Sequence, residues 1–465
     1  MTERVRYYLG QGLNPEQIDQ VISDAYWVVE KVGVQVEPDS LRRSVAGQRG
    51  IYVTGKNVRF NPDVVNACWK AAQAADTARS QSFVIDNGGN VLSLIDFRTG
   101  EARPPRVIDL IEMSKLCDAL GLSGYAPVLP QDFPPALQEV AANYYARCFA
   151  RALGGGMVTG IASAEYIYEM SLVAGPPFRV EYYVASPLAF DATGLEIVQR
   201  FHGRGVPIAV GSFLLAGNSA PLSLRAAWTQ WLAENLAAVS LMTYACLGDP
   251  IQWMADGGAH ACDFRYTNVR AGSPEEILFR LTGIQLMRHL SVEARGTVMV
   301  MGKQPDARAA AERLAGLLTY SMAGVHEFYG AGLLGFDSIF SGEQLILDLE
   351  LLAYIERVAH GMIWDSSETC RTVISRPDPI TQYLTDELTL KRLRSETWSS
   401  PLFEYALLEQ WRREGEESTS HRIRSMAEQA IIHHSYELTP EKKREMDTIW
   451  KRAQDEMGSS PQTIN

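Results

Sequence analysis

The sequence predicts an α/β fold of the TIM-like (β/α)8 barrel type, with an N-terminal α+β cap and a C-terminal helical extension. Over residues 121–380, apolar runs alternate with helical patterns, and these runs are continuously apolar. Continuously apolar strands are typical of a parallel sheet that is covered on both faces. An open doubly wound sheet would favour a GxGxxG or P-loop motif after its first strand, and neither motif follows the first expected strand. A closed barrel is therefore the better interpretation.

Seven strand–helix units are expected in this central region. The expected strands are residues 124–129, 156–161, 180–185, 207–214, 250–254, 296–301 and 325–329, and an eighth is expected near 370–374. The clearest helices are 221–246, 274–289, 306–322 and 342–358. Two helix starts are chemically explicit, because Ser273 precedes Pro274 and Glu276, and Ser341 precedes Gln344 at the same spacing.

Two regions of different texture flank the central one. Residues 1–120 contain an amphipathic pattern over 14–34 and a hairpin over 51–60 with its turn at Gly55, and we interpret them as an α+β cap. Residues 381–465 are charged and helical in pattern. The predicted organisation is therefore a cap, a barrel over 121–380 and a C-terminal helical segment.

Composition and charge exclude several classes of function. The 465 residues are 46% apolar and 21% charged, and the net charge is −12. This charge argues against nucleic acid as the main partner, because phosphate contacts need clustered Lys and Arg. The six cysteines are dispersed without a CxxC pair, which favours reduced thiols. No apolar stretch approaches a membrane span and no signal-type core follows Met1, so a cytoplasmic protein without a membrane partner is expected.

One segment, residues 324–346, concentrates reactive and aromatic side chains. It contains His326, Glu327, Tyr329, Phe336 and Asp337, in the order strand, glycine-rich turn and capped helix. This order is how an α/β barrel builds part of an active-site rim, where the strands end. We therefore take His326, Glu327 and Asp337 as candidate catalytic residues.

Four further candidates lie on other expected strands or follow them: Tyr125, Phe213, Trp253 and His260. Each aromatic taken alone is more often a core residue. Collectively, a ring of aromatic faces with a few carboxylates suits a cation, since each face contributes about 0.5–2 kcal/mol of attraction. The sequence has no Ser/His/Asp motif, no nucleophile elbow and no HExxH motif, and no metal site is predicted.

Several ordered segments resemble the trimethylamine methyltransferase superfamily, in its branch without pyrrolysine. The segments that carry the resemblance are 329–332, 336–338 and 343–345, supported by 96–104, 218–223, 256–258 and 272–275, and by Trp398 to Trp411. The resemblance implies a TIM barrel that moves a methyl group from a methylated amine to the Co(I) corrinoid, a cobalamin, of a separate protein. The chain itself would then bind no cofactor, and its partners would be a cognate corrinoid protein and a small quaternary or tertiary methylamine.

The resemblance also bears on the substrate. The sequence contains no pyrrolysine, and the branch without it includes enzymes that act on glycine betaine and related quaternary amines. This chain departs from the pattern at Ile339, where relatives tend to have Gly, and at His326 and Glu327, where smaller residues are common. These positions lie at the expected pocket, so the resemblance leaves the identity of the amine open.

Elementary chemistry favours the quaternary amine. Displacement at a methyl group of R₄N⁺ releases a neutral amine, so neither a general acid nor a covalent adduct is needed. The expected cage is Tyr125, Trp253, Tyr329 and Phe336, and Phe213 is a further candidate for substrate binding. His260 and His326 would bind a substrate carboxylate. Glu327 and Asp337 would orient the remaining groups.

Three alternatives remain open from the sequence. The first is a tertiary-amine substrate, as in trimethylamine methyltransferases. The second is a barrel lyase or isomerase acting on a small acid, with Glu327 as base and His326 as acid. The third is a relative that binds a betaine without turnover. The sequence also leaves open whether the chain forms a homo-oligomer.

Overall fold

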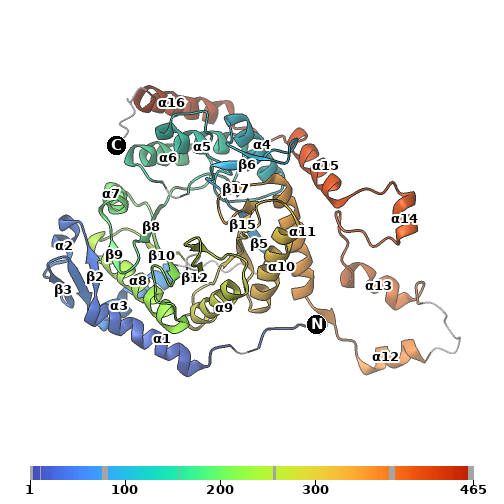
Figure 1. Ribbon diagram of the computed structural model, residues 1–465, viewed down its shortest axis with the longest axis horizontal. Helices are drawn as coiled ribbons and strands as arrows, with labels where there is room; N and C mark the ends of the chain where they lie inside the picture. Colours follow the sequence, from blue (N-terminus) through green and yellow to red (C-terminus); the bar gives the residue numbers. More distant parts are fainter. Residues whose placement is uncertain are drawn as a thin grey trace.

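The computed structural model describes residues 4–10, 12–75, 82–156, 158–254, 258–375 and 383–458. These residues form a mixed α/β structure in which helices surround a curled set of parallel strands (Figure 1). The strands that pair in parallel at the centre fall into two groups, and the strands of each group are hydrogen-bonded to one another.

The first group has β10 (Ile208–Ala216) at its centre. It pairs in parallel with β8 (Val180–Val184) on one side, and on the other with β11 (Ile251–Trp253) and then β12 (Gly258–Asp263). The strands expected at 180–185, 207–214 and 250–254 are therefore confirmed.

The second group has β15 (Glu327–Ala331) at its centre, between β14 (Gly296–Thr297) and β5 (Val84–Asn87). Parallel bridges from Asn87 to Gly124 and from Gly124 to Leu153 continue this group. A strand from the first 120 residues therefore belongs to the parallel sheet. The division of the chain into three domains stays a prediction.

The prediction of an eighth strand near residues 370–374 is wrong. These residues lie in α12 (Ser367–Ile374), which begins after Ser366, and the Ser366 side chain accepts a hydrogen bond from the Thr369 backbone. Local N-capping outweighs the β-branched residues here. Among the described residues, no ladder joins β12 to β14 or Leu153 to β8.

Helices alternate with the parallel strands along the chain. They are α4 (Val107–Ala119), α5 (Pro135–Phe149), α6 (Ile161–Val173), α7 (Ala192–Phe201), α8 (Leu224–Ala245), α9 (Pro274–His289), α10 (Ala307–Met322) and α11 (Gly342–Ala359). The Ser273 and Ser341 hydroxyl groups cap α9 and α11, as their spacing predicts. A strand was expected over residues 156–161, but Ile161 is the first residue of α6.

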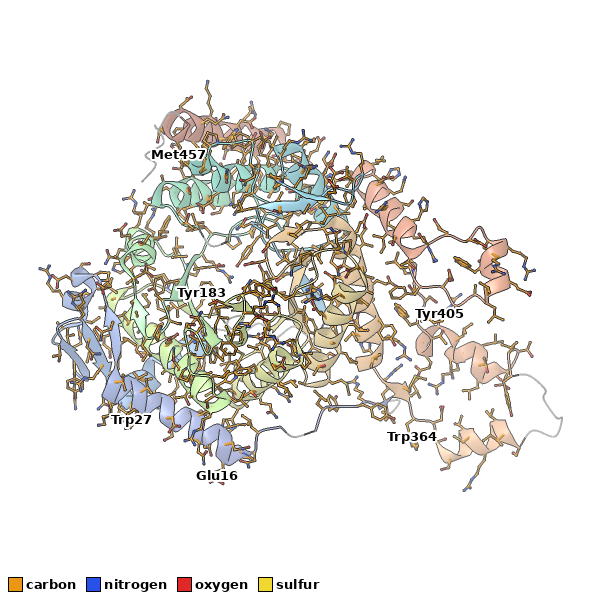
Figure 2. The ribbon with its side chains drawn as sticks, in the orientation of Figure 1. Glu16, Trp27, Tyr183, Trp364, Tyr405 and Met457 are labelled. Atoms are coloured by element: carbon orange, nitrogen blue, oxygen red, sulfur yellow. The ribbon has the colours of Figure 1, made fainter. Side chains whose placement is uncertain are left out.

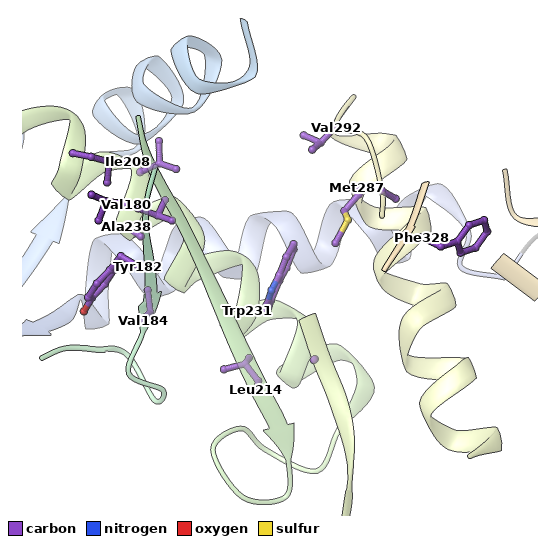
Figure 3. Close-up of a cluster of buried hydrophobic side chains, with 14 of the residues drawn as sticks. Val180, Tyr182, Val184, Ile208, Leu214, Trp231, Ala238, Met287, Val292 and Phe328 are labelled. Atoms are coloured by element: carbon purple, nitrogen blue, oxygen red, sulfur yellow. The ribbon is translucent and has the colours of Figure 1, made fainter. Parts of the chain in front are cut away.

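The core lies between the parallel strands and these helices. Val180, Tyr182 and Val184 of β8 are buried on one face of the strand, and Trp231 of α8 is fully buried beside β10 (Figure 3). Because successive side chains point to opposite faces of a strand, Glu181 and Tyr183 lie on the other face.

The cap contains α1 (Pro15–Trp27), the π-helix η1 (Val28–Val32), α2 (Asp39–Val45), α3 (Pro62–Ala75), β2 (Val34–Val36), β3 (Ile51–Thr54) and β4 (Asn57–Phe60). The hairpin expected at 51–60 is confirmed, since β3 and β4 pair antiparallel. The remaining short strands lie at the edges of the cap and in loops elsewhere in the chain. They are β1 (Arg4–Val5), β6 (Ser93–Ile95), β7 (Ala102–Arg103), β9 (Ala189–Phe190), β13 (Asn268–Val269), β16 (Leu333–Leu334), β17 (Ile339–Phe340) and β18 (Met362–Ile363).

The C-terminal part is helical, as expected. It contains α13 (Glu387–Glu396), α14 (Leu408–Arg413), α15 (Thr419–Ile432) and α16 (Pro440–Met457). Helix α15 packs on α4 and α11, and α16 packs on α5 and α6. None of the described helices combines the length and the apolar character that a membrane span requires.

Candidate active site

The inner face of the parallel strands is polar and aromatic. On β15, Glu327 and Tyr329 alternate with the buried Phe328, as Glu181 and Tyr183 alternate with buried neighbours on β8. The side chain of Tyr183 lies toward the middle of the molecule (Figure 2). The face opposite the helices therefore carries hydroxyl groups, carboxylates and rings rather than aliphatic side chains.

Tyr125 connects the two groups of strands across this inner face. Its ring lies 6.0 Å from that of Tyr329, in an edge-to-face arrangement. Its hydroxyl group donates to the Glu181 carboxylate, at 3.2 Å and 3.0 Å from the two oxygens. Since β8 and β15 do not pair with each other, Tyr125 reaches across the interior between them.

Two carboxylates on this face each lie beside an arginine. The Arg179 guanidinium lies 2.7 Å from Glu181, whose side chain is only 2% exposed. Arg295 donates from Nε to Glu327 at 3.0 Å. Each carboxylate charge is therefore largely balanced by a neighbouring cation.

Phe213, His260 and Phe336 form a second aromatic group. The His260 ring is stacked on Phe213 with centroids 4.1 Å apart and an interplanar angle of 25°, and Phe336 lies 6.0 Å from Phe213. Phe336 has a φ of 69°, and its backbone N–H donates to the Val300 carbonyl at 2.7 Å. A positive φ at a non-glycine residue is uncommon, and this hydrogen bond holds the Phe336 backbone in it.

His260 is fixed from behind by Glu276 of α9. Its Nδ1 lies 2.6 Å from Glu276 Oε1, and the other carboxylate oxygen accepts from the Ala261 N–H at 2.8 Å. Burial alone would raise the pKa of Glu276, but His260 and Arg280 outweigh it and lower that pKa. Glu276 is therefore ionised, which makes Nδ1 the proton-bearing nitrogen.

The other ring nitrogen of His260 is left for a ligand or a water molecule. Nε2 is buried and makes no hydrogen bond with any described residue. His260 and Phe336 line a narrow cavity beside Thr297, Met299 and Tyr320, with room for about 10 Å³, close to the space that one water molecule needs. A buried, unpaired nitrogen at a cavity is a group that a polar substrate can satisfy.

The sequence predicted that His326 and Glu327 lie where their strand ends. In the structure, neither residue is at the carboxyl end of the strand. The strand is Glu327–Ala331 rather than 325–329, so His326 precedes it and Glu327 begins it. The His326 ring packs edge-on against Phe83, with centroids 4.9 Å apart. Burial, followed by Arg6 and His360, lowers the pKa of His326. His326 therefore lies at the amino end of the sheet, away from Phe336.

Trp253 is not part of either aromatic group. Its indole N–H donates to Asn235 of α8 at 2.8 Å, and its ring lies 4.6 Å from Trp69 and 5.3 Å from Trp231. Trp253 pairs with Val210, whose side chain faces the helices. Gln252 rather than Trp253 shares the inner face with Ala209 and Glu181. The expected cage is therefore corrected at Trp253, because a shift of one residue along a strand moves a side chain to the opposite face.

Asp337 lies in the loop between β16 and β17, next to Phe336, and is exposed. The surrounding protein raises its pKa by desolvation. Among the described residues, one group could offer three metal ligands, His202, Cys246 and Asp249, and it includes none of the predicted site residues.

The sequence profile of the family described as trimethylamine methyltransferase (MTTB) matches residues 5–458. The chain belongs to this family. The family resemblance expected from the ordered segments is therefore confirmed.

Individual relatives of this family member are distant. Glycine betaine methyltransferase of Desulfitobacterium hafniense (strain Y51) is 24% identical over 431 residues, covering 86% of this chain and 88% of that protein. Trimethylamine methyltransferase MttB of Methanosarcina thermophila is 25% identical over 192 residues, covering 40% of this chain and 38% of that protein. The crystal structure of Methanosarcina barkeri monomethylamine methyltransferase aligns with a TM-score of 0.45 and 12% identity, covering 97% of this chain and 96% of that chain.

Sequence reasoning missed three charged residues of this trimethylamine methyltransferase family member: Glu181, Glu276 and Arg295. A signal existed for Glu181, because a carboxylate in an otherwise apolar strand suggests a functional inner face. Glu276 was visible only as the third residue of a capped helix. Its contact with His260 depends on tertiary packing, and no local pattern indicates it.

Proposed function

We propose that the protein transfers a methyl group from a quaternary methylamine of the glycine betaine type to the Co(I) corrinoid of a partner protein. The observation that carries the proposal is the aromatic inner face, on which Tyr125 and Tyr329 lie 6.0 Å apart and Phe213 and Phe336 are separated by the same distance. Membership of a methyltransferase family supports the reaction type.

The reaction fits a site without a free acid. Attack on one methyl carbon breaks its bond to nitrogen, the electron pair of that bond stays on nitrogen, and a neutral tertiary amine leaves. No proton has to be supplied, and the cobalt of the partner is the nucleophile. The task of this chain is therefore to hold the cation with one methyl group toward the partner, which is catalysis by orientation.

The charge balance of the inner face favours the same reaction. The substrate loses its positive charge in the transition state, so strong binding of the cation by free carboxylates would slow the step. Glu181 and Glu327 are each beside an arginine, at 2.7 Å and 3.0 Å. Aromatic faces then supply most of the attraction for the cation.

A carboxylate on the substrate has a partner in His260. Its buried Nε2 lacks a protein partner among the described residues, and Glu276 fixes the ring from the other side, 2.6 Å from Nδ1. The cavity at Nε2 has room for about one water molecule, which would donate one hydrogen to Nε2 and the other to the carboxylate of a betaine. This supports glycine betaine over a simple tetraalkylammonium ion.

For the fold, we propose a closed (β/α)8 barrel that begins at β5. Eight parallel segments occur in chain order, namely β5, the bridged residues Gly124 and Leu153, and then β8, β10, β11 with β12, β14 and β15. The pairing of β5 with β15 joins the first segment to the last, as closure requires.

The proposal is tested with a substrate panel and free cob(I)alamin. Quaternary methylamines, with and without a carboxylate, are compared with trimethylamine by following the loss of the Co(I) absorbance. We expect the highest kcat/KM for a quaternary amine that carries a carboxylate. Turnover of trimethylamine alone would replace the proposal with the tertiary-amine alternative.

The lyase or isomerase alternative finds no support. Adjacent residues of a strand point to opposite faces, and His326 packs on Phe83 while Glu327 contacts Arg295. The two groups therefore do not act on one substrate.

A further inference from the structure

Three side chains that can bind a metal ion meet outside the aromatic inner face. They are His202, Cys246 and Asp249, and their ligand atoms all lie within 4.8 Å of one another. His202 is the C-cap of α7, Cys246 is the C-cap of α8, and Asp249 lies in the turn between α8 and β11. Residues 47 positions apart in the sequence therefore contribute to one small cluster.

The cluster lies at the amino end of the strands, away from Phe336. Ile208 is the first residue of β10 and pairs with Ile251, the first residue of β11. The three side chains come from the two connections that lead into these neighbouring strands. Phe336, by contrast, follows the carboxyl end of β15. The cluster is therefore separate from the site of the proposed reaction.

The turn between α8 and β11 places the thiol and the carboxylate together. The Asp249 N–H donates to the Cys246 carbonyl at 3.1 Å, and Gly248 has a φ of 93°, which closes a tight turn. The Gly203 N–H, at the end of α7, donates to both Asp249 carboxylate oxygens, at 3.1 Å and 3.0 Å. The backbone thus fixes the carboxylate between the ends of the two helices.

The charges around the cluster favour a cation. The Asp249 side chain is only 2% exposed, and among the described residues no lysine or arginine forms an ion pair with it. Its partner is the His202 ring, whose Nδ1 lies 2.6 Å from the carboxylate. Both helices bring their carbonyl ends to the cluster, and a helix C-terminus carries partial negative charge. A buried carboxylate between two helix C-termini is short of positive charge.

We propose that His202, Cys246 and Asp249 bind a divalent metal ion of the zinc class. Zinc prefers imidazole nitrogen, thiolate sulfur and carboxylate oxygen in a tetrahedral arrangement, and these are the three ligand types present. The His202 side chain is 42% exposed, so a water molecule can reach the fourth position. The ion links the end of α7 to the turn before β11 and stabilises the amino end of the sheet.

The protons and charges of this site balance. On binding, the Cys246 thiol releases its proton to solvent, while the His202 ring binds through one nitrogen and keeps its proton on the other. One dication with one thiolate and one carboxylate is uncharged overall. An uncharged centre suits this place, because Cys246 is 3% exposed and the Asp249 side chain 2%. This proposal does not depend on the proposed reaction.

Titration with Co²⁺ tests the site, using the full chain without a polyhistidine tag after treatment with a chelator. A thiolate bound to Co²⁺ gives a charge-transfer absorbance in the near ultraviolet. We expect this absorbance to saturate at one ion per chain and to disappear when Zn²⁺, the tighter-binding ion, is added. Cys246→Ala should abolish it. Cys370→Ala, which removes the exposed cysteine of α12, is the matched control and should leave it unchanged.

The histidine is tested by competition with a chromophoric chelator. We expect His202→Ala to weaken Zn²⁺ binding by more than about 100-fold, since loss of an outer-shell partner alone costs about 10- to 100-fold. His421→Ala removes another exposed histidine beside a carboxylate, Glu417, and should keep the wild-type affinity. Equal affinities in the two variants would contradict the assignment of His202.

X-ray absorption at the zinc edge of the wild type covers the case in which Cys246→Ala fails to fold. We expect one sulfur at about 2.3 Å and nitrogen or oxygen ligands at about 2.0–2.2 Å from the ion. Nitrogen and oxygen ligands alone would show an adventitious surface ion only and would overturn the proposal. Failure of the wild type to take up an ion would do the same, as would a thiolate absorbance that persists without Cys246.

Discussion

The hydroxyl group of Tyr125 lies 3.0 Å from the Glu181 carboxylate, to which it donates a hydrogen bond, while its ring contacts Tyr329 on the far side of the interior. One residue thus joins a charge-balanced carboxylate to an aromatic surface. A phenol held in this way keeps its ring in a fixed orientation, which a site for a rigid cation needs.

Removal of an aromatic face should weaken substrate binding. We expect Tyr329→Ala to raise KM by roughly 2- to 30-fold, the equivalent of about 0.5–2 kcal/mol of cation–π attraction. Tyr329→Phe keeps the ring and should stay near the wild type. Steady-state kinetics with a quaternary amine measure both, and equal losses in the two variants would show that the hydroxyl group matters rather than the ring.

His260 and Glu276 should act together in binding a substrate carboxylate. Glu276 Oε1 lies 2.6 Å from His260 Nδ1, so Glu276→Ala removes the group that orients the ring. We expect KM to rise more for a betaine than for a tetraalkylammonium ion. Equal losses with the two substrates would instead indicate that Glu276 only supports the structure.

Trp253 should contribute to stability rather than to binding. It packs against Trp69 and Trp231 under the helices. Trp253→Leu is expected to destabilise the protein by about 1–3 kcal/mol, less than the loss of a fully buried aromatic side chain would cost, because Trp253 is partly buried. Denaturant unfolding gives this value, while KM for the amine should not change. A raised KM with unchanged stability would return Trp253 to the binding site.

A buried ion pair holds the loop that leads to Phe336. Arg313 and Asp348 are fully buried and 3.0 Å apart, and Asp348 also accepts from the Gly332 N–H at 2.9 Å. We expect Asp348→Ala to cost about 3–5 kcal/mol, because it leaves a buried charge unpaired. Arg308→Ala, which removes an arginine whose side chain is 60% exposed from its pair with Glu312, should cost less than about 1 kcal/mol in the same unfolding experiment.

Acid should destabilise the protein partly through Asp96. The Arg103 side chain, with the backbone N–H groups of Arg98 and Thr99, lowers the pKa of Asp96 from 3.8 to about 2. A carboxylate with a depressed pKa stabilises the fold above its ordinary pKa and loses this contribution as pH falls toward 2. The melting temperature of Asp96→Asn should therefore fall less steeply below pH 4 than that of the wild type. Parallel slopes would contradict this.

The elements with local signals could be predicted. Helix α9 begins and ends where its cap and last turn indicate, and β8 and β10 follow continuous apolar runs. Strand β5 could not be predicted from the sequence, because Val84–Asn87 is short and ends in polar residues. Only its pairing with β15 defines it as a strand. Sheet pairing between distant segments leaves no local pattern.

The candidate site was predictable to the level of residue type. Aromatic residues along the strands indicated a cation site, and Tyr125, Tyr329, Phe213, His260 and Phe336 do fall into two contacting groups. Which face a strand residue occupies depends on register, and one residue of error moved Trp253 to the wrong face.

The most direct test of the central claim is a single assay with glycine betaine and cob(I)alamin, in which Co(I) loss and dimethylglycine formation are measured together. The account predicts that both proceed at equal rates, without added acid catalysts and without release of ammonium. Consumption of trimethylamine but not of glycine betaine under the same conditions would contradict it.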